Sequence, residues 1–499
     1  MNGGMPRVTQ FARPRHFSAF GLALLAAVGA IMAAPADAGA AATAAADLAV
    51  DFSKSAGEIR PLHGGNGGPV DGTGLLDLSG YHQALAIPYT RLHDCLWPDP
   101  NVVDIHAVFP DFKADPARPE SYDFARSDAY IQPIVLAGSR IVYRLGESIE
   151  HTKRKYRVHP PPDAAKWAAA CLGVIRHYNE GWANGSHFNI PYWEIWNEPE
   201  NRPAMWTGTD QDYCRLYTVT AKAIKARFPD LRVGGPAVGY SGRVTGETLE
   251  PTPFLTGFLD ACKREGAPLD FFSWHTYTDD PSAVTARARA IRRWLDSSGF
   301  AKTESHLNEW NYLPGNDWTP MGPAGQGQAR EAWYAAMGGA PGAAFTACTL
   351  LELQDAPVDV ACYYSADFKD FGLFTRHGVP KKTFYAFKAF KALLDTPLRV
   401  EARGSESGRL AVAAGMARDK ASATLLASNL RSAQDKVTLA VKNLPWGGPA
   451  AYEVFILDAA RDLEKVRAGT SPAGDFTLSE DLKPPGVCLI TLRKPAATD

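Results

Sequence analysis

Residues 193–199 read Trp-Glu-Ile-Trp-Asn-Glu-Pro, and residues 306–311 read His-Leu-Asn-Glu-Trp-Asn. Each stretch has the composition of a short strand and carries an Asn-Glu pair near its end. Pro199 cannot donate to a sheet ladder, so it ends the first strand and leaves Glu198 just beyond it. Glu309 holds the corresponding place in the second stretch. Two carboxylates at the ends of two strands predict a fold in which strand ends meet, as they do at the mouth of a parallel barrel.

The chain around these two stretches alternates short apolar runs with segments of helical period. One such helical segment places Tyr213, Leu216 and Ile224 on one face. Eight runs between residues 59 and 394 have the character of strands: Ile59–Gly64, Pro88–Asp94, Ile141–Glu147, Pro191–Glu198, Leu231–Gly235, Leu269–Tyr277, His306–Asn311 and Val358–Tyr364. Repeated strand-then-helix units over this length predict a TIM (β/α)8 barrel, an α/β fold, over residues 57–397.

The last hundred residues have a different pattern of apolar and polar residues. From residue 398 to 499, short alternating runs such as Leu410–Met416 and Lys436–Leu444 are separated by Gly, Asn, Asp and Pro. This pattern predicts a C-terminal antiparallel β-sandwich as an accessory domain. Residues 39–56 are expected to be a linker in which Leu48–Phe52 adds a strand to the sandwich.

The first 38 residues have the order of a secretory signal. Three arginines precede the uncharged run Ser18–Ala34, and Ala36-Asp37-Ala38 offers an A-x-A cleavage site. We expect cleavage there and export to the periplasm or the medium, with no stable membrane insertion afterwards. The alternative is an uncleaved membrane anchor, because the run approaches the ~18 to 20 residues that span a bilayer.

Composition narrows the ligand class. Lys and Arg number 52 against 54 Asp and Glu, for a net charge of -2, so no basic patch is indicated and nucleic acid is an unlikely partner class. The 12 Trp and 18 Tyr exceed what a core requires, and such rings suit carbohydrate clefts. The seven cysteines show no close CxxC spacing, which disfavours zinc, although Cys348 and Cys362 could form one bridge. We expect no metal and no cofactor.

A pair of glutamates in this setting points to cleavage of glycosidic bonds. One carboxyl must carry a proton for the leaving oxygen, and apolar neighbours are expected to raise its pKa. The other must stay ionised to attack the anomeric carbon. A single glutamate would more often be a solvated loop charge, but two at strand ends of the same predicted barrel favour the catalytic interpretation.

Further motifs occur in a fixed order. Residues 89–93 read Tyr-Thr-Arg-Leu-His, residues 233–237 Val-Gly-Gly-Pro-Ala, and residues 272–277 Phe-Ser-Trp-His-Thr-Tyr; Gly372-Leu373-Phe374 precedes a closing Pro-Lys-Lys segment at 380–382. With the two Asn-Glu stretches, this set resembles glycoside hydrolase family 39, a family of (β/α)8 retaining glycosidases, over roughly residues 55 to 395.

The resemblance implies a role for each matching residue. Glu198 would be the general acid/base and Glu309 the nucleophile of a double displacement, with their carboxyls about 5 to 5.5 Å apart. Asn197 would bind the sugar 2-hydroxyl, and Arg91 would orient Glu309 and keep it ionised. The remaining expected substrate-binding residues are His93, His275, Tyr277 and Trp310, with Trp206 and Trp318 as further stacking candidates.

The family does not fix the sugar. An exo-acting β-xylosidase acting on plant or bacterial glycans is the leading interpretation, with an oligosaccharide or polysaccharide as the binding partner. An arabinosidase, an endo-acting hydrolase or a catalytically silent glycan-binding barrel stays open. Glu147 ends the third predicted strand outside any motif and is either a substrate contact or a member of a structural ion pair.

Overall fold

The computed structural model describes residues 46–97, 99–323, 325–368 and 370–495. The predicted signal peptide, residues 1–38, and the first part of the predicted linker lie outside this range. Among the described residues, no helix combines the length and apolar character that crossing a membrane requires.

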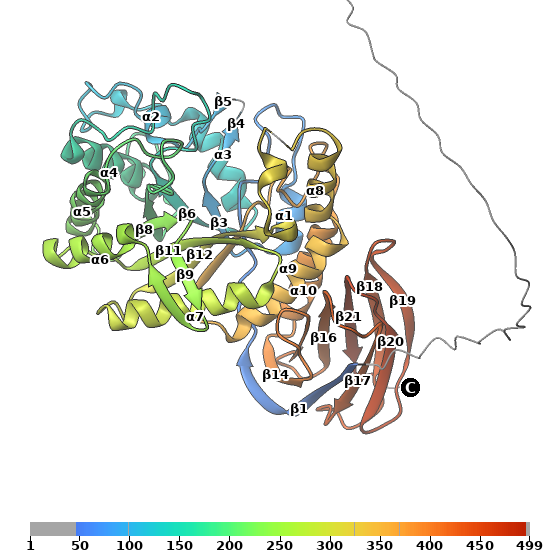
Figure 1. The fold of residues 1–499 in the computed structure, drawn as a ribbon. Helices are drawn as coiled ribbons and strands as arrows, with labels where there is room; N and C mark the ends of the chain where they lie inside the picture. The colour runs from blue at the N-terminus through green and yellow to red at the C-terminus, as the bar shows by residue number, and fades with distance from the viewer. Residues whose placement is uncertain (1–45, 98, 324, 369, 496–499) are drawn as a thin grey trace, which may run out of the picture. The chain divides into compact units, whose positions relative to one another are not determined.

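Eight parallel strands close into a barrel, which confirms the predicted TIM fold (Figure 1). They follow one another round the barrel in chain order: β2 (Gly64–Asn66), β3 (Tyr89–Leu92), β6 (Arg140–Leu145), β7 (Tyr192–Ile195), β8 (Arg232–Val238), β11 (Phe271–Thr278), β12 (Glu304–Tyr312) and β13 (Val360–Tyr363). Because all eight point the same way, their carboxyl ends surround a single mouth.

Seven predicted strands overlap the observed ones along most of their length, and the first does not. Strand β2 is only three residues long and begins where the prediction Ile59–Gly64 ends. Ile59 and Leu62 are buried apolar residues, so the segment around them has the composition of a strand. Ile59 instead donates its backbone N–H to Pro397, beside the start of the C-terminal domain.

Helices follow the barrel strands as the apolar periodicity predicts. The longer ones are α3 (Ala125–Leu136), α4 (Ala164–Glu180), α5 (Asp210–Arg227), α6 (Pro253–Glu265), α7 (Pro281–Ser297), α9 (Ala340–Glu352) and α10 (Lys382–Leu394); α1 (Ser79–Leu85), α2 (Ile105–Val108) and α8 (Gln328–Gly338) lie in or near loops. Helix α5 begins at a capping box formed by Thr209 and Asp212. Its face containing Tyr213, Leu216 and Ile224 is buried, as expected.

The C-terminal strands form one nine-stranded sheet, in the order β19-β18-β21-β16-β15-β14-β1-β17-β20. Its members are β1 (Ala46–Glu58), β14 (Leu398–Arg403), β15 (Leu410–Met416), β16 (Ser422–Asn429), β17 (Lys436–Lys442), β18 (Ala451–Leu457), β19 (Asp462–Thr470), β20 (Phe476–Asp481) and β21 (Gly486–Arg493). Figure 1 shows β1 between β14 and β17, so the predicted added strand is present.

The strands of residues 398–499 pair antiparallel to one another, as predicted, and the added strand β1 pairs antiparallel to β14 and parallel to β17. The sheet also curls on itself instead of forming two separate sheets. Leu439 on β17 and Ile490 on β21 pack in one apolar cluster although four strands separate them in the sheet. Arg467 of edge strand β19 donates to Glu480 of the opposite edge strand β20, which brings the two edges together.

Apolar packing joins the barrel to this sheet. Helix α9 is buried along almost its whole length, and Leu426 and Leu489 of the sheet belong to the same apolar cluster as the barrel core. The Ser428 hydroxyl donates to the carbonyl of Ala344 at 2.7 Å. All seven cysteines are unpaired, so the suggested bridge between Cys348 and Cys362 is absent.

Candidate active site

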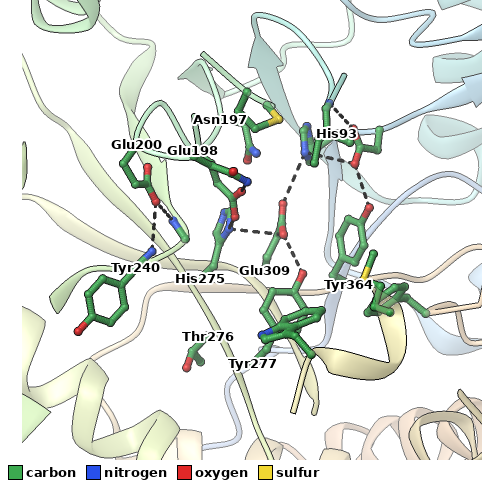
Figure 2. Close-up of a pocket in the computed structure, with 18 of the residues that line it drawn as sticks. His93, Asn197, Glu198, Glu200, Tyr240, His275, Thr276, Tyr277, Glu309 and Tyr364 are labelled. Carbon is green, nitrogen blue, oxygen red and sulfur yellow. Dashed lines mark hydrogen bonds and ion pairs between the residues drawn. The ribbon is translucent and has the colours of Figure 1, made fainter. Parts of the chain in front are cut away.

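A cavity of about 800 Å³ opens at the carboxyl ends of the barrel strands. Glu198 and Glu309 both line it, together with four of the predicted substrate-binding residues: His93, Asn197, His275 and Tyr277. Figure 2 shows Glu198, His275 and Glu309 directed toward one another across the cavity. The two stretches quoted at the outset therefore meet in space although about 110 residues separate them in the chain.

Backbone conformation turns Glu198 into the cavity. Its φ of 43° lies in the left-handed region, which costs a residue with a side chain on the order of 1 kcal/mol or more. The strain is held by a hydrogen bond from the Glu198 N–H to the carbonyl of Ala237 at 3.0 Å. Ala237 itself has a φ of 53° and falls at a bulge in the pairing of β8 with β11.

A second bulge aligns Glu309. Along β11 and β12, Trp274 pairs with Leu307 but His275 pairs with Glu309, so Asn308 is the extra residue. Bulges of this kind are frequent next to active sites because they redirect a side chain. Here the bulge brings the carboxylate of Glu309 level with His275, whose Nδ1 lies 3.5 Å from Oε2 of Glu309.

Glu309 is held by two strong donors. Nη1 of Arg91 donates to Oε1 at 2.8 Å, and the hydroxyl of Tyr277 donates to Oε2 at 2.8 Å. Only 5% of Glu309 is exposed, so the carboxylate can rotate little. These contacts fix the direction of the carboxylate and favour its ionised form.

Arg91 lies beneath the site and is fully buried. Beyond Glu309, its guanidinium donates to Glu194 through Nε at 2.7 Å and to Oδ1 of Asn197 through Nη2 at 2.7 Å. It also donates to Asn66 on β2. A single cation thereby ties side chains from β2, β7 and β12 together, a use for which the planar fork of arginine is suited.

Glu198 contacts His275 and Asn201. Its Oε1 lies 2.8 Å from Nδ1 of His275, and its Oε2 accepts a hydrogen bond from Asn201 at 2.9 Å. One carboxylate oxygen each of Glu198 and Glu309 and a ring nitrogen of His275 all lie within 4.8 Å of one another. That spacing matches the short carboxyl separation of retaining glycosidases and is well below the ~6.5 to 9.5 Å of inverting ones.

The pKa of Glu198 differs from the expectation, which was that apolar surroundings raise it. Burial alone would do so, but the hydrogen bond and charge of His275, helped by Asn201, outweigh it and hold the pKa below its usual value. Burial raises the pKa of Glu309, although His275 and Arg91 oppose it. Burial disfavours a charged His275, yet Glu309 and Glu198 raise its pKa. Both pKa directions favour placing the proton shared by Glu198 and His275 on the imidazole.

One predicted substrate contact is wrong. Trp310 is fully buried and packs its ring against Tyr363 at 5.2 Å, because neighbouring residues of a strand face opposite sides and Glu309 faces inward. Arg91 does not line the cavity, and its hydrogen bonds to Glu309 and Asn197 agree with the expected role of orienting Glu309. Trp206 is also buried, against Trp196. Trp318 does line the cavity and is 43% exposed.

Glu147 belongs to a structural network. It accepts hydrogen bonds from the N–H and Nδ1 of His106 and is not among the residues that line the cavity. Of the two alternatives left open by the sequence, the ion-pair interpretation fits the structure.

Several cavity residues were not predicted as site residues from the sequence, among them Asp94, Glu200 and Tyr364. The hydroxyl of Tyr364 donates to Oδ2 of Asp94 at 3.1 Å, which joins the ends of β3 and β13. Asp94 and Glu200 adjoin His93 and Glu198 in the chain, and that proximity was the available signal. All three lie past the strand ends, where the alternation of a strand no longer says which way a side chain points.

Two clusters among the described residues contain three side chains of metal-binding type: Glu198 with His275 and Glu309, and Asp104 with His106 and Glu147. In each, the oxygens already accept hydrogen bonds from protein donors, and a buried arginine, Arg91 or Arg144, supplies the positive charge. Neither is assigned a metal.

Comparison with known proteins agrees with this geometry. Residues 82–445 match the family model described as glycosyl hydrolases family 39. A β-xylosidase of Geobacillus stearothermophilus is 29% identical over 264 residues, 48% of this chain and 49% of that protein. A β-xylosidase of Caldicellulosiruptor saccharolyticus is 27% identical over 274 residues, 50% of each chain. The chain thus spans about half the length of the curated relatives it matches.

Solved structures resemble the whole described fold. A glucosidase from Croceicoccus marinus superposes with a TM-score of 0.76 at 25% identity, covering 91% of this chain and all of that one. A monomeric β-xylosidase from Caulobacter crescentus superposes with a TM-score of 0.66 at 19% identity over the same shares. The second likeness shows the shared fold alone.

Proposed function

Because this chain belongs to glycosyl hydrolase family 39, we propose that it is a retaining glycosidase that cleaves O-glycosidic bonds through a glycosyl-enzyme intermediate. The observation that carries the proposal is the pair Glu198 and Glu309, with carboxylate oxygens within 4.8 Å of each other at the floor of an 800 Å³ cavity. A pair this close leaves no room for a water between sugar and carboxylate, so one carboxylate attacks the anomeric carbon directly.

Glu309 is the nucleophile. Arg91 and Tyr277 hold its two oxygens in fixed directions, and Arg91 favours the ionised form. Glu198 is the acid/base, since its side chain is bound by His275 and Asn201 and has no arginine contact. A proton on His275 lies one hydrogen bond from Glu198, so the pair together holds the proton that the leaving oxygen requires. Asn197, beside Glu198, is positioned by Arg91 to receive the sugar 2-hydroxyl.

The cavity has a polar end and an apolar rim. His93, Asp94 and Tyr364 supply hydrogen-bonding groups suited to sugar hydroxyls, while Trp318 and Met321 are large exposed apolar side chains. Exo action on the terminal sugar of a chain is part of this proposal. The β-xylosidase relatives make a β-xyloside the first substrate to test, and the glucosidase neighbour makes a β-glucoside the second.

The test is hydrolysis of aryl β-xylosides, α-L-arabinosides and β-glucosides by the natural protein and by Glu309→Ala. We expect turnover of at least one glycoside, with loss of activity in the variant. If the natural protein and Glu309→Ala gave the same zero rate on every glycoside and oligosaccharide, the glycan-binding alternative would replace this proposal.

Assignment of the acid/base needs a separate experiment. Glu198→Ala should lose most of its rate on substrates with poor leaving groups and recover with azide on activated ones, because azide attacks the intermediate without base assistance. Absence of azide rescue would remove Glu198 from this role. Release of monosaccharide alone at early times from xylo-oligosaccharides supports exo action, whereas a mixture of shorter oligomers contradicts it.

Export is also proposed, on the sequence of residues 1–38. N-terminal sequencing of the protein recovered from outside the cytoplasm should begin at Gly39. A protein that keeps Met1 and sediments with membranes would support the anchor alternative instead.

A further inference from the structure

Glu200 lines the cavity two residues after Glu198 and has no part in the mechanism above. Its Oε1 accepts hydrogen bonds from the backbone N–H groups of Gly239 at 2.6 Å and Tyr240 at 3.1 Å (Figure 2). Its Oε2 is buried and has no hydrogen-bond partner among the described residues. A carboxyl buried with one oxygen unsatisfied is costly, which points to a purpose beyond fold stability.

Gly239 lies against both carboxyls. A Cβ built on this residue would be 2.6 Å from Oε1 of Glu198 and 3.3 Å from Oε1 of Glu200. The two oxygens are therefore within about 6 Å of each other. The hydrogen bonds of Glu200 fix the backbone that forms the wall behind the acid/base, and they also fix Tyr240, which is 58% exposed at the edge of the cavity.

The pKa of Glu200 lies near neutral pH. Burial, followed by the negative charge of Glu198, raises the pKa of Glu200 to about 7, while the N–H of Tyr240 and the charge of His275 act in the opposite direction. The other ionisable groups that line the cavity from neighbouring elements include Arg287 of α7, His151 and Glu309. A carboxylate formed here makes removal of the proton shared by Glu198 and His275 less favourable, because it adds a negative charge beside the pair.

We propose that Glu200 is a positioning residue for the acid/base. It anchors the Gly239–Tyr240 backbone behind Glu198, and its ionised carboxyl keeps the catalytic proton on the Glu198–His275 pair as the solution becomes neutral. This inference rests on the proposed glycosidase function. It assigns a role to a third glutamate, which acts through the Glu198–His275 pair and the wall of the cavity.

The test compares Glu200→Gln and Glu200→Ala with the matched control Glu352→Gln. Glutamine keeps an oxygen for the two N–H donors and removes the charge, whereas alanine removes both. Glu352 is likewise half-buried and accepts a backbone N–H, from Gly408 at 2.6 Å, but does not line the cavity. The readout is the pH profile of kcat/KM on an aryl glycoside with a poor leaving group, with an activated one in parallel.

In Glu200→Gln the basic limb should move to lower pH by at least roughly half a unit, the effect of a charge about 6 Å away at the dielectric constant of water. Activity on the acid side should stay within a few-fold, because the anchor is kept. Glu200→Ala should lose about ten-fold or more in kcat on the poor leaving group and less on the activated one, since only the former needs the acid. Glu352→Gln should leave both limbs in place.

A basic limb that does not move in an active Glu200→Gln enzyme overturns the proposal, and this variant keeps the test valid if Glu200→Ala fails to fold. Difference infrared titration of the cavity carboxyls, in the natural protein and in Glu200→Gln, measures the effect of the Glu200 charge on the Glu198–His275 pair without turnover. The inference can therefore be judged even if no glycoside in the panel is hydrolysed.

Discussion

Replacement of Tyr277 by Phe tests how the protein keeps Glu309 ready to attack. The change removes one hydroxyl that donates to Oε2 of Glu309 at 2.8 Å and leaves the ring in place. A hydrogen bond to a charged acceptor contributes about 1.5–3 kcal/mol, and each pKa unit corresponds to about 1.4 kcal/mol. Loss of the donor should therefore raise the pKa of Glu309 by about one to two units.

The direction of the pKa shift follows from the fact that the Tyr277 hydroxyl stabilises the ionised form of Glu309. Tyr277 lowers the pKa of Glu309 against the rise that burial causes, so its removal favours the protonated carboxyl. A protonated Glu309 cannot attack the anomeric carbon. The acid limb of kcat/KM should move to higher pH by about one to two units, with a loss of roughly 10- to 100-fold below the limb and partial recovery above it.

The assay is the pH profile of kcat/KM on the best aryl glycoside, with Tyr217→Phe as the control. The Tyr217 hydroxyl donates to the carbonyl of Pro268 at 2.9 Å on the outer side of the barrel wall, so this variant loses a comparable bond away from the cavity. It should cost about 0.5–1.5 kcal/mol of stability and leave the profile unchanged. An acid limb that stays in place in Tyr277→Phe would refute the reasoning.

Three other outcomes are expected. Arg91→Met should lower the free energy of unfolding by about 3–5 kcal/mol in urea titrations, because Glu194 and Glu309 are left buried without their cation. Adding Glu194→Gln should restore part of the lost stability. Equal stability of Arg91→Met and the natural protein would contradict the ion-pair account. Trp318→Ala should raise KM several-fold with a smaller change in kcat, since this ring is exposed at the cavity edge and packs against the ring of Tyr277, whose hydroxyl bond to Glu309 stays in place; a kcat effect alone would argue against a binding role. Dialysis against EDTA should leave activity unchanged, and inhibition reversed by added divalent cation would show a metal requirement.

The barrel and the positions of its two central glutamates follow from local sequence. Alternating strand and helix periods repeat along the chain, and Pro199 marks the strand end beside Glu198. The same alternation would also have excluded Trp310, since a residue next to the inward-facing Glu309 must face outward. His275 and Tyr277, two residues apart on β11, both contact Glu309 for that reason.

Tertiary structure decided what depends on residues distant in the chain. The parallel pairing of β1 with β17 joins segments almost 400 residues apart, and β19 has no buried face from which a strand could be predicted. The pKa of Glu198 falls because His275 of β11, distant in the chain, lies 2.8 Å from it, and apolar sequence neighbours gave the opposite expectation. Glu200 enters the cavity because the left-handed turn at Glu198 and the backbone after β8 direct it there. Sequence period determines which face of a strand a residue occupies, whereas the direction of a loop side chain and the charge around it are set by contacts that only the folded chain brings together.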